Sequence, residues 1–253
     1  MKISVSGKGG VGKTTVSANL IKFLASENYQ VFAVDADPDT SLGMVLGLPE
    51  EELAKQLPVV DMREIIAEKT GGSGAFFSLN PDVGDILDSY TVRQGNINFL
   101  KMGAVKQGGS SCYCRENSVL NALVGSLLLR KKEAVLLDMG AGIEHLTRGT
   151  AKDVDLMLIV TEPSKVSVQT AKVVKKLAGE LGIEKIKIVG NKIRNQKEKD
   201  FVYASFPSGD VIGMIDFDEA VLDQAMGLEV QEPQNLSKNI EVLGQQILRE
   251  VGE

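Results

Sequence analysis

The chain alternates short apolar runs with longer segments in which apolar residues recur every three or four positions. The short runs are rich in Val, Ile and Leu, which is typical of strands buried on both faces. The predicted strands are Ile3–Ser6, Gln30–Asp35, Ile97–Met102, Glu133–Asp138, Asp155–Thr161, Lys185–Gly190 and Gly209–Gly213. Such strands, separated by helical segments, indicate a parallel sheet covered by helices on both faces.

The helical segments are recognised by apolar stripes. One helix is predicted directly after the first strand, and two more at Asn117–Lys131 and Ser167–Leu181. A last stripe lies near the C-terminus, and we expect it to pack on the core. The first and last stripes consist of Val16, Leu20, Phe23 and Leu24, and of Ile240, Leu243, Ile247 and Val251.

The organisation of the chain favours one domain. No internal repeat and no linker is visible in the 253 residues. We therefore predict an α/β fold over residues 1–253, with a single doubly wound, mostly parallel sheet and helices on both faces. A less regular insertion is predicted at about residues 47–95, and a loop at Gly108–Cys114. Ligands of such sheets bind at the carboxyl ends of the strands.

Composition and charge narrow the class of partner. The net charge is −6, aromatic residues make up 5% of the chain, and Trp is absent. These values favour neither a basic groove for DNA nor a stacking platform for single strands, so we expect no nucleic-acid partner. No signal peptide or membrane-spanning run is visible, so we expect a cytoplasmic protein with no membrane partner.

A glycine-rich run follows the first strand and carries the strongest chemical signal. Residues 7–15 read GKGGVGKTT, which fits the P-loop pattern G-x-x-x-x-G-K-[ST] and adds a second lysine, Lys8. Lys13 can reach the β- and γ-phosphates of a nucleotide, and the Thr14 hydroxyl can sit on Mg²⁺. A turn without a ligand is the alternative, but the strand before and the helix after it favour a P-loop NTPase. The predicted phosphate-binding residues are Gly9, Gly10, Val11, Gly12, Lys13, Thr14 and Thr15.

Carboxylates follow two of the predicted strands. Asp138 ends a buried strand, where a P-loop protein holds the water shell of Mg²⁺; a helix cap is the alternative. Asp35, Asp37 and Asp39 alternate at the end of the second strand. One of the three can assist Mg²⁺ and another can orient the attacking water, whereas a solvated turn is the other interpretation. We predict that Asp35, Thr14 and Asp138 hold magnesium.

Asn191 and Lys192 follow the strand Lys185–Gly190. A side-chain amide at this point can both donate to and accept from a purine edge. A simple turn at Gly190–Asn191 explains the same residues equally well. We predict that Asn191 and Lys192 contact the base.

Together these motifs resemble the deviant P-loop ATPases, the class that includes MinD, ParA and the nitrogenase iron protein. The run from Asp35 to Asp39 resembles the first switch of that class, and the run from Asp138 to Gly142 resembles the second. The resemblance spans about the whole chain. It implies hydrolysis of ATP to ADP and ATP-dependent dimerisation, with Lys8 crossing to the phosphates of the partner and Asp39 positioning water.

One position departs from that class. In the family, the loop after the last strand usually carries a Pro before an acidic residue near the base. Here the run is Met214–Asp218, with Asp216 where the Pro would be. Contacts from this loop to the base are therefore not implied by the resemblance.

Two cysteines lie close together in one predicted loop. Cys112 and Cys114 are poorly placed for an unstrained disulfide, and two thiolates make only half of a tetrahedral site. No further Cys exists, and the only His is His145, so four sulfurs require a second chain about a twofold axis. We predict a Cys₄ metal site shared by a homodimer; small apolar fillers or one reactive thiol are the alternatives. Four thiolates suit Zn²⁺, Ni²⁺ or an Fe–S cluster.

A nucleotide-gated dimer with a shared Cys₄ site resembles the CooC-type accessory ATPases. The resemblance implies a metallochaperone that couples its nucleotide state to Ni²⁺ or Zn²⁺ at Cys112 and Cys114. It also implies a client, the nickel-containing carbon monoxide dehydrogenase.

Two other functions compete with a metallochaperone. An Fe–S carrier or electron donor like the nitrogenase iron protein would also use two cysteines per subunit, but on separate loops. A spatial organiser on membrane or DNA would need a basic amphipathic tail. Residues 233–253 carry two basic and three acidic side chains instead.

Overall fold

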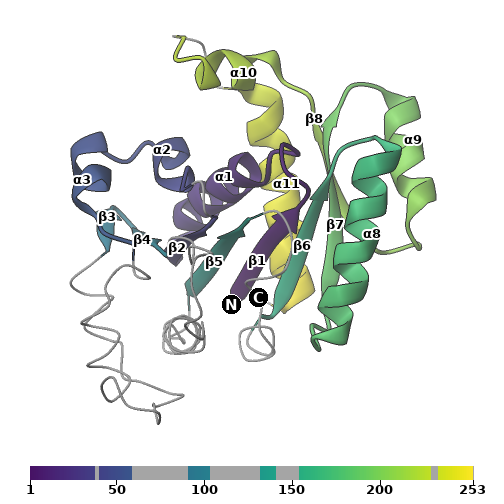
Figure 1. Ribbon diagram of the computed structural model, residues 1–253, viewed down its shortest axis with the longest axis horizontal. Helices are drawn as coiled ribbons and strands as arrows, with labels where there is room; N and C mark the ends of the chain where they lie inside the picture. The colour runs from purple at the N-terminus through teal and green to yellow at the C-terminus, as the bar shows by residue number, and fades with distance from the viewer. Residues whose placement is uncertain (38–39, 59–90, 103–131, 141–153, 229–232, 253) are drawn as a thin grey trace, which may run out of the picture.

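The structure is a computed structural model that describes residues 1–37, 40–58, 91–102, 132–140, 154–228 and 233–252. In this part of the chain one sheet runs through the centre with helices on both faces (Figure 1). The strands are β1 Lys2–Gly7, β2 Gln30–Ala36, β3 Val92–Gln94, β4 Ile97–Lys101, β5 Glu133–Met139, β6 Leu156–Thr161, β7 Ile186–Ile193 and β8 Val211–Asp216. The helices are α1 Lys13–Ser26, α2 Leu42–Leu46, α3 Glu50–Lys55, α8 Lys165–Glu180, α9 Gln196–Ser205, α10 Glu219–Ala225 and α11 Gln234–Val251.

The order of the strands is β3-β4-β2-β5-β1-β6-β7-β8. All neighbours pair in parallel except β3, which runs antiparallel to β4. The central strand β1 therefore lies between β5 and β6, and the carboxyl ends of β1, β2 and β5 meet at one edge. In this register Asp35 of β2 is the direct partner of Asp138 of β5.

Alternating residues of the strands contribute to two separate hydrophobic cores, one on each face of the sheet. Ile3 and Val5 of β1 pack with α1 and α11, whereas Met157 and Ile159 of β6 pack with α8 and α9. The central strands are buried on both faces, as expected of a doubly wound sheet, and in β1 this includes the polar residues Lys2, Ser4 and Ser6. The predicted α/β class is confirmed.

Three helices begin at side-chain caps. Ser164 Oγ accepts from the backbone N–H of Ser167 at the start of α8. Asn195 Oδ1 accepts from the N–H of Glu198 at the start of α9, and Asp218 caps α10 through the N–H of Ala220. Each cap satisfies a donor that the helix itself leaves open.

The predicted strands are confirmed, and their observed ends differ most from the predicted ones at the last two strands, β7 and β8. Strand β7 continues to Ile193, which pairs with Asp216 of β8, and its pairing with β8 is irregular between Gly190 and Ile193. Asn191 and Lys192 lie within this strand and do not form the turn that was the alternative interpretation. Strand β8 covers Val211–Asp216, so Met214 and Asp216 end this strand and do not lie in a loop after it.

The helix predicted at Ser167–Leu181 is found as α8, which begins two residues earlier, and the C-terminal stripe packs on the core from α11. The insertion predicted at about residues 47–95 is regular at its ends, where α3 and β3 form. Residues 59–90, the predicted helix Asn117–Lys131 and the loop Gly108–Cys114 lie outside the described residues. The assignment of the whole chain to one domain stays a prediction. No helix among the described residues is long and apolar enough to cross a membrane.

Candidate functional site

The glycine-rich run forms a tight connection between β1 and α1. Gly7 and Gly12 have φ of 147° and 91°, a region that side chains with a Cβ rarely adopt. A Cβ at Gly7 would meet the carbonyl oxygen of Val160, and one at Gly12 would meet Nδ2 of Asn191. The loop therefore needs glycine at both positions to lie against β6 and β7.

The start of α1 is open toward this loop. Gly12 is the N-cap residue, and no side chain caps the helix, so its first N–H groups remain available for an anion. Lys13 is 7% exposed, and its Nζ lies 3.3 Å from the carbonyl oxygen of Lys8. The loop, the open helix end and the Lys13 ammonium together form a phosphate cradle.

Two buried carboxylates lie beside the cradle, on neighbouring strands. Asp138 Oδ1 accepts from Ser17 Oγ at 2.8 Å, and the Thr14 side chain also hydrogen-bonds this carboxylate. Asp138 Oδ2 is buried and has no hydrogen-bond partner in the part of the chain that the structure describes. On β2, Asp35 accepts from the N–H of Leu42 at 3.0 Å and from that of Asp37 at 3.2 Å.

Burial makes both carboxylates reluctant to ionise. Desolvation raises the pKa of Asp35 to about 7, and the neighbouring Asp138 adds to the shift. Desolvation also raises the pKa of Asp138, against the hydrogen bonds from Ser17 and Thr14 and the charge of Lys13. A divalent cation would relieve both effects, because it supplies the positive charge that the buried pair lacks.

The residues therefore fit a magnesium ion. Mg²⁺ prefers oxygen ligands, keeps several waters and needs one or two carboxylates beside the phosphates. The unpartnered Oδ2 of Asp138 and the adjacent Thr14 hydroxyl meet this need, with Asp35 in the next strand. Ser17 was not predicted to belong to the site. Its position on the apolar face of the helix, three residues after Thr14, is a signal in the sequence that could have identified it.

Asn191 and Lys192 contact the phosphate loop from β7. Asn191 Nδ2 donates to the carbonyl oxygen of Val11 at 2.8 Å, and Lys192 Nζ donates to that of Gly10 at 2.6 Å. Both side chains thus hold the loop, and Lys192 adopts φ of 60° in doing so. The bond to Val11 uses one of the two N–H groups of the Asn191 amide, so its Oδ1 and its second N–H can both be offered to a base.

A cleft of about 60 Å³ lies next to the loop, between β7, β8, α10 and α11. Asn191 forms one side of it and the segment Ile215–Asp218 another. The lining residues are Gly12, Thr15, Asn191, Lys192, Ile215, Asp216, Phe217, Asp218, Val221, Leu222 and Leu236. Its position beside the phosphate cradle suits the base of a nucleotide, and its hydrophobic residues suit a flat aromatic ring.

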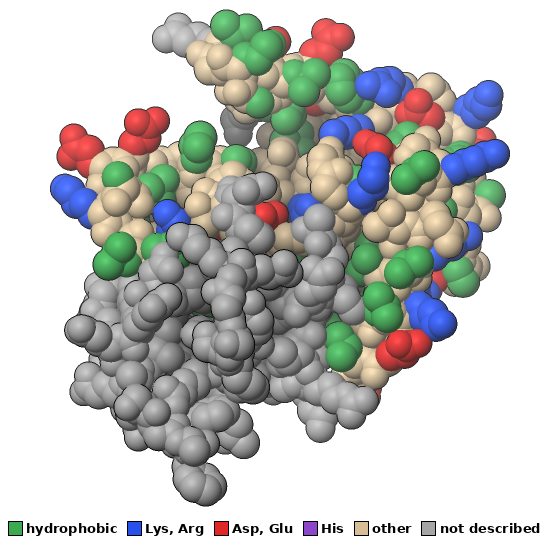
Figure 2. Space-filling model, in the orientation of Figure 1, with side chains coloured by type: hydrophobic (Ala, Val, Ile, Leu, Met, Phe, Trp, Pro, Cys, Tyr) green, Lys and Arg blue, Asp and Glu red, His purple; other side chains and the backbone are tan. Residues whose placement is uncertain are grey.

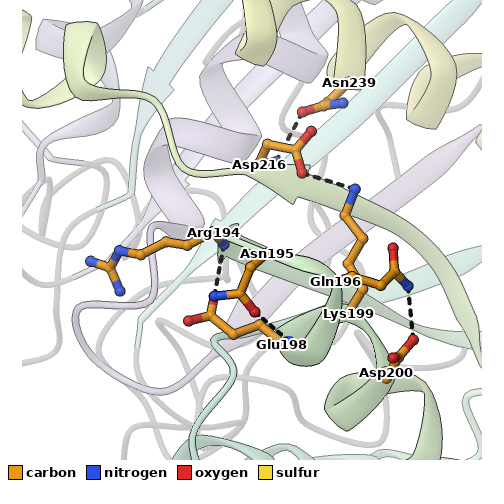
Figure 3. A network of polar contacts seen from close by, with 8 residues as sticks. All are labelled: Arg194, Asn195, Gln196, Glu198, Lys199, Asp200, Asp216 and Asn239. Atoms are coloured by element: carbon orange, nitrogen blue, oxygen red, sulfur yellow. Dashed lines mark hydrogen bonds and ion pairs between the residues drawn. The ribbon is translucent and has the colours of Figure 1, made fainter.

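Asp216, which lines this cleft, belongs to a network of polar contacts that Figure 3 shows. Asp216 pairs with Lys199 of α9 at 3.1 Å, and its backbone N–H donates to Asn239 of α11 at 2.9 Å. The guanidinium of Arg194 lies 4.6 Å from the ring centre of Phe217. The position where the resembling family has Pro is therefore held by side chains that sequence reasoning did not identify.

Three predicted site residues lie outside the described residues, namely Asp39, Cys112 and Cys114. The only His, His145, lies outside them as well. The described residues contain no group of three or more His, Cys, Asp or Glu side chains around a metal-sized space. The prediction of a thiolate site rests on residues beyond that search.

Comparison with known proteins agrees with this geometry. Residues 2–229 match the CobQ/CobB/MinD/ParA nucleotide binding domain. The carbon monoxide dehydrogenase accessory protein CooC of Rhodospirillum rubrum is 43% identical over 230 residues, covering 89% of this chain and 88% of that protein. An uncharacterized ATP-binding protein of Methanocaldococcus jannaschii is 38% identical over 257 residues, covering 98% of both chains.

More distant similarities are consistent with these. An iron-sulfur cluster carrier protein of Pyrococcus horikoshii is 32% identical over 172 residues, which cover 66% of this chain and 52% of that protein. Among solved structures, MinD in the MinC:MinD cell division complex of Aquifex aeolicus has a TM-score of 0.70 at 21% identity, covering 98% of this chain and 95% of that one. At this identity the structural likeness supports the fold alone.

Proposed function

The chain belongs to the CobQ/CobB/MinD/ParA family of nucleotide-binding ATPases, and from this premise we propose that it is an ATP-dependent metallochaperone for carbon monoxide dehydrogenase. In this proposal, binding and hydrolysis of ATP drive a dimer that holds nickel and delivers it to the client. The observation that carries the proposal is the joint presence of a phosphate cradle with two buried carboxylates and 43% identity to an accessory protein of that enzyme over most of the chain.

The phosphate cradle supports hydrolysis of a nucleoside triphosphate. The Lys13 ammonium would lie beside the β- and γ-phosphates of a bound nucleotide, and the uncapped first N–H groups of α1 would donate to the same phosphate oxygens. Asp138, Asp35 and Thr14 would hold Mg²⁺, which neutralises charge on the β- and γ-phosphates when it is bound. Water then attacks the γ-phosphorus and ADP leaves. We propose that Asp39 orients this water and that Lys8 reaches the phosphates of the partner subunit.

The amide of Asn191 supports ATP over GTP. One N–H of its Nδ2 donates to Val11, and we propose that Oδ1, and not the second N–H, faces a base in the adjoining cleft. An acceptor at this place can take a hydrogen bond from the exocyclic amino group of adenine, whereas it would meet the oxygen at the same position of guanine unfavourably.

The proposed cargo site is formed by Cys112 and Cys114 from each subunit. Two thiolates per chain can close a four-coordinate site only when two chains meet, so dimer and metal stabilise one another. Nickel and zinc both accept four thiolates, and the identity to an accessory protein of a nickel enzyme favours nickel as the physiological cargo.

Activation of nickel-free carbon monoxide dehydrogenase tests the proposal. We expect the wild-type chain with ATP and Ni²⁺ to restore carbon monoxide oxidation, because nickel reaches the client only through the loaded dimer. Lys13→Ala should abolish both ATP hydrolysis and activation, and Cys112→Ser should abolish activation alone. Lys22→Ala, which alters an exposed lysine on the same helix, is the matched control. Full activation by the Cys112→Ser variant would contradict the proposal.

The second candidate function is an Fe–S cluster carrier, which the similarity to the Pyrococcus carrier favours. It predicts that anaerobic reconstitution with iron and sulfide gives a stable visible absorption that Cys112→Ser removes. Loss of all visible absorption on desalting of the wild-type chain would exclude this function.

A further inference from the structure

A second hollow, larger than the base cleft, lies between α2, α3 and β4. It has a volume of about 240 Å³, and most of its lining is apolar. Its walls are formed by Thr40, Met44, Glu50, Leu53, Phe99 and Lys101. We refer to it as the α2–α3 groove; none of its walls belongs to the phosphate cradle.

The walls of the groove are held in place by close packing. A Cβ at Gly43 would lie 2.6 Å from Cδ2 of Leu53 and 3.0 Å from Cζ of Phe99, so α2 meets α3 and β4 as closely as a glycine allows. Gln56 Nε2 donates to the carbonyl oxygen of Phe99 at 3.2 Å, which fixes the end of α3 to β4. These contacts fix α2, α3 and β4 relative to one another, and the groove between them is therefore a part of the folded structure.

Large apolar side chains stand exposed around the groove. Met44 is 68% exposed, Leu57 is 62% exposed and Val45 is 39% exposed. Exposed apolar residues that gather beside a hollow mark an interaction surface, and the flexible side chain of Met adapts well to a partner. Figure 2 shows hydrophobic side chains together with acidic and basic ones at the left edge of the molecule, where α2 and α3 lie.

The charge of the rim selects the partner. Glu50, Glu51 and Glu52 form the first turn of α3 and are exposed, and Glu50 lines the groove. Lys101 also lines the groove and Lys55 ends α3, so three acidic side chains stand against two basic ones. We propose that the α2–α3 groove docks a segment of the client protein that carries a large apolar side chain next to Lys or Arg. The inference rests on the proposed function, because it takes the client to be the dehydrogenase.

The groove is connected to the magnesium carboxylates by one hydrogen bond. Leu42, the first residue of α2, donates its backbone N–H to Oδ2 of Asp35 at 3.0 Å, and its side chain is fully buried. A cation bound at Asp35 would therefore contact the same carboxylate that anchors the helix carrying Met44. Client affinity is expected to differ between the ATP and ADP states, since coupling requires a difference in affinity.

Binding to immobilised nickel-free carbon monoxide dehydrogenase tests the inference. The wild-type chain is compared with Met44→Asp and Glu50→Lys, each with Mg²⁺ and either a slowly hydrolysed ATP analogue or ADP. We expect each variant to bind at least about tenfold more weakly, because a loss of 1.4 kcal/mol is tenfold and both changes act on a buried contact. Met226→Asp is the matched control, since Met226 is 67% exposed but lies beyond α10, away from the groove.

The outcomes separate this inference from the proposed function. Wild-type binding that Met44→Asp and Glu50→Lys leave unchanged would overturn the groove and spare the accessory function. Equal affinity in the two nucleotide states would overturn the coupling through Asp35. No binding by the wild-type chain would remove the proposed client and the groove together. Hydrolysis of ATP by Met44→Asp should stay within about twofold of wild type, since Met44 lies outside the nucleotide site.

Discussion

At the scale of single residues, the buried carboxylates explain why the site calls for a cation. Asp35 and Asp138 are fully buried and are direct partners on the neighbouring strands β2 and β5. Lys13 is the cation that favours the charged form of Asp138, and Asp138 Oδ2 has no partner among the described residues. An ionised pair in this setting is costly until a divalent cation arrives, so nucleotide and magnesium should bind together.

The raised pKa of Asp35 predicts a pH dependence of stability in the metal-free protein. The folded chain keeps a proton up to about pH 7, whereas the unfolded chain releases it near 3.8. Stability should therefore fall as the pH rises through this window, by up to about 1.4 kcal/mol per pH unit, and level off above it. Urea unfolding in EDTA at about pH 5 and pH 8 measures this slope.

Asp35→Asn is the control for this pH effect. An amide of the same shape carries no proton to release, so its stability should be less dependent on pH over the same range. Parallel pH profiles for the variant and the wild-type chain would show that the slope arises elsewhere.

At the scale of elements, strand β7 acts as a support for the phosphate loop. Asn191 and Lys192 donate to the carbonyl oxygens of Val11 and Gly10, so the loop is fixed before any nucleotide arrives. Fixed backbone N–H groups bind phosphate without a further ordering cost, which favours affinity.

Gly12→Ala tests this support. The added methyl group would meet Nδ2 of Asn191, and Gly12 has φ of 91°, so we expect a loss of about 1–3 kcal/mol in stability and of ATP binding. Gly9→Ala is the matched control for stability alone, because nothing lies within 4 Å of a Cβ there, although Gly9 itself belongs to the predicted phosphate loop. Thermal unfolding and nucleotide titration measure both effects. Equal stability of the two variants would contradict the role of β7.

Two other glycines, one at the contact between α11 and α1 and one on α8, should respond to alanine in opposite ways. A Cβ at Gly244 of α11 would enter the ring of Phe23 on α1, so Gly244→Ala should destabilise by about 1–3 kcal/mol. Gly179 of α8 has open space around it, and Gly179→Ala should stabilise by up to about 1 kcal/mol through helix propensity. Chemical unfolding of both variants checks the prediction, which fails if the two changes have the same sign.

At the scale of the whole molecule, the sequence predicts the sheet well because strands such as β6 are apolar on both faces. The run from Leu156 to Thr161 contains only buried residues, and no other element type explains it as well. The P-loop was equally readable, because glycines at fixed spacing are required by its backbone. Asp138 could also be identified from the sequence, because it is a carboxylate at the end of the apolar strand β5.

Features that depend on contacts between distant segments were not readable. Asn191 and Lys192 look like a turn in sequence, and only their hydrogen bonds to Val11 and Gly10 show that they extend β7 and hold the loop. The short helices α9 and α10 have weak stripes and depend on their caps and on packing. The ion pair of Asp216 with Lys199 joins β8 to α9, which no local pattern encodes.

The central claim concerns two chains, because one chain has only two cysteines. If nucleotide binding brings Cys112 and Cys114 of two subunits together, metal and dimer form in one step. The sheet edge that carries the phosphate cradle would then control a metal site to which each subunit contributes half of the ligands.

The most direct test is the amount of metal bound per chain, measured anaerobically at saturating Ni²⁺ or Zn²⁺ for the wild-type chain and for Cys112→Ser. The account predicts about one metal ion per two chains, in a dimer, and loss of this metal in the variant while ATP binding persists. Metal that the variant retains, or a wild-type chain that binds none, would contradict the account and leave an ATPase without a thiolate cargo site.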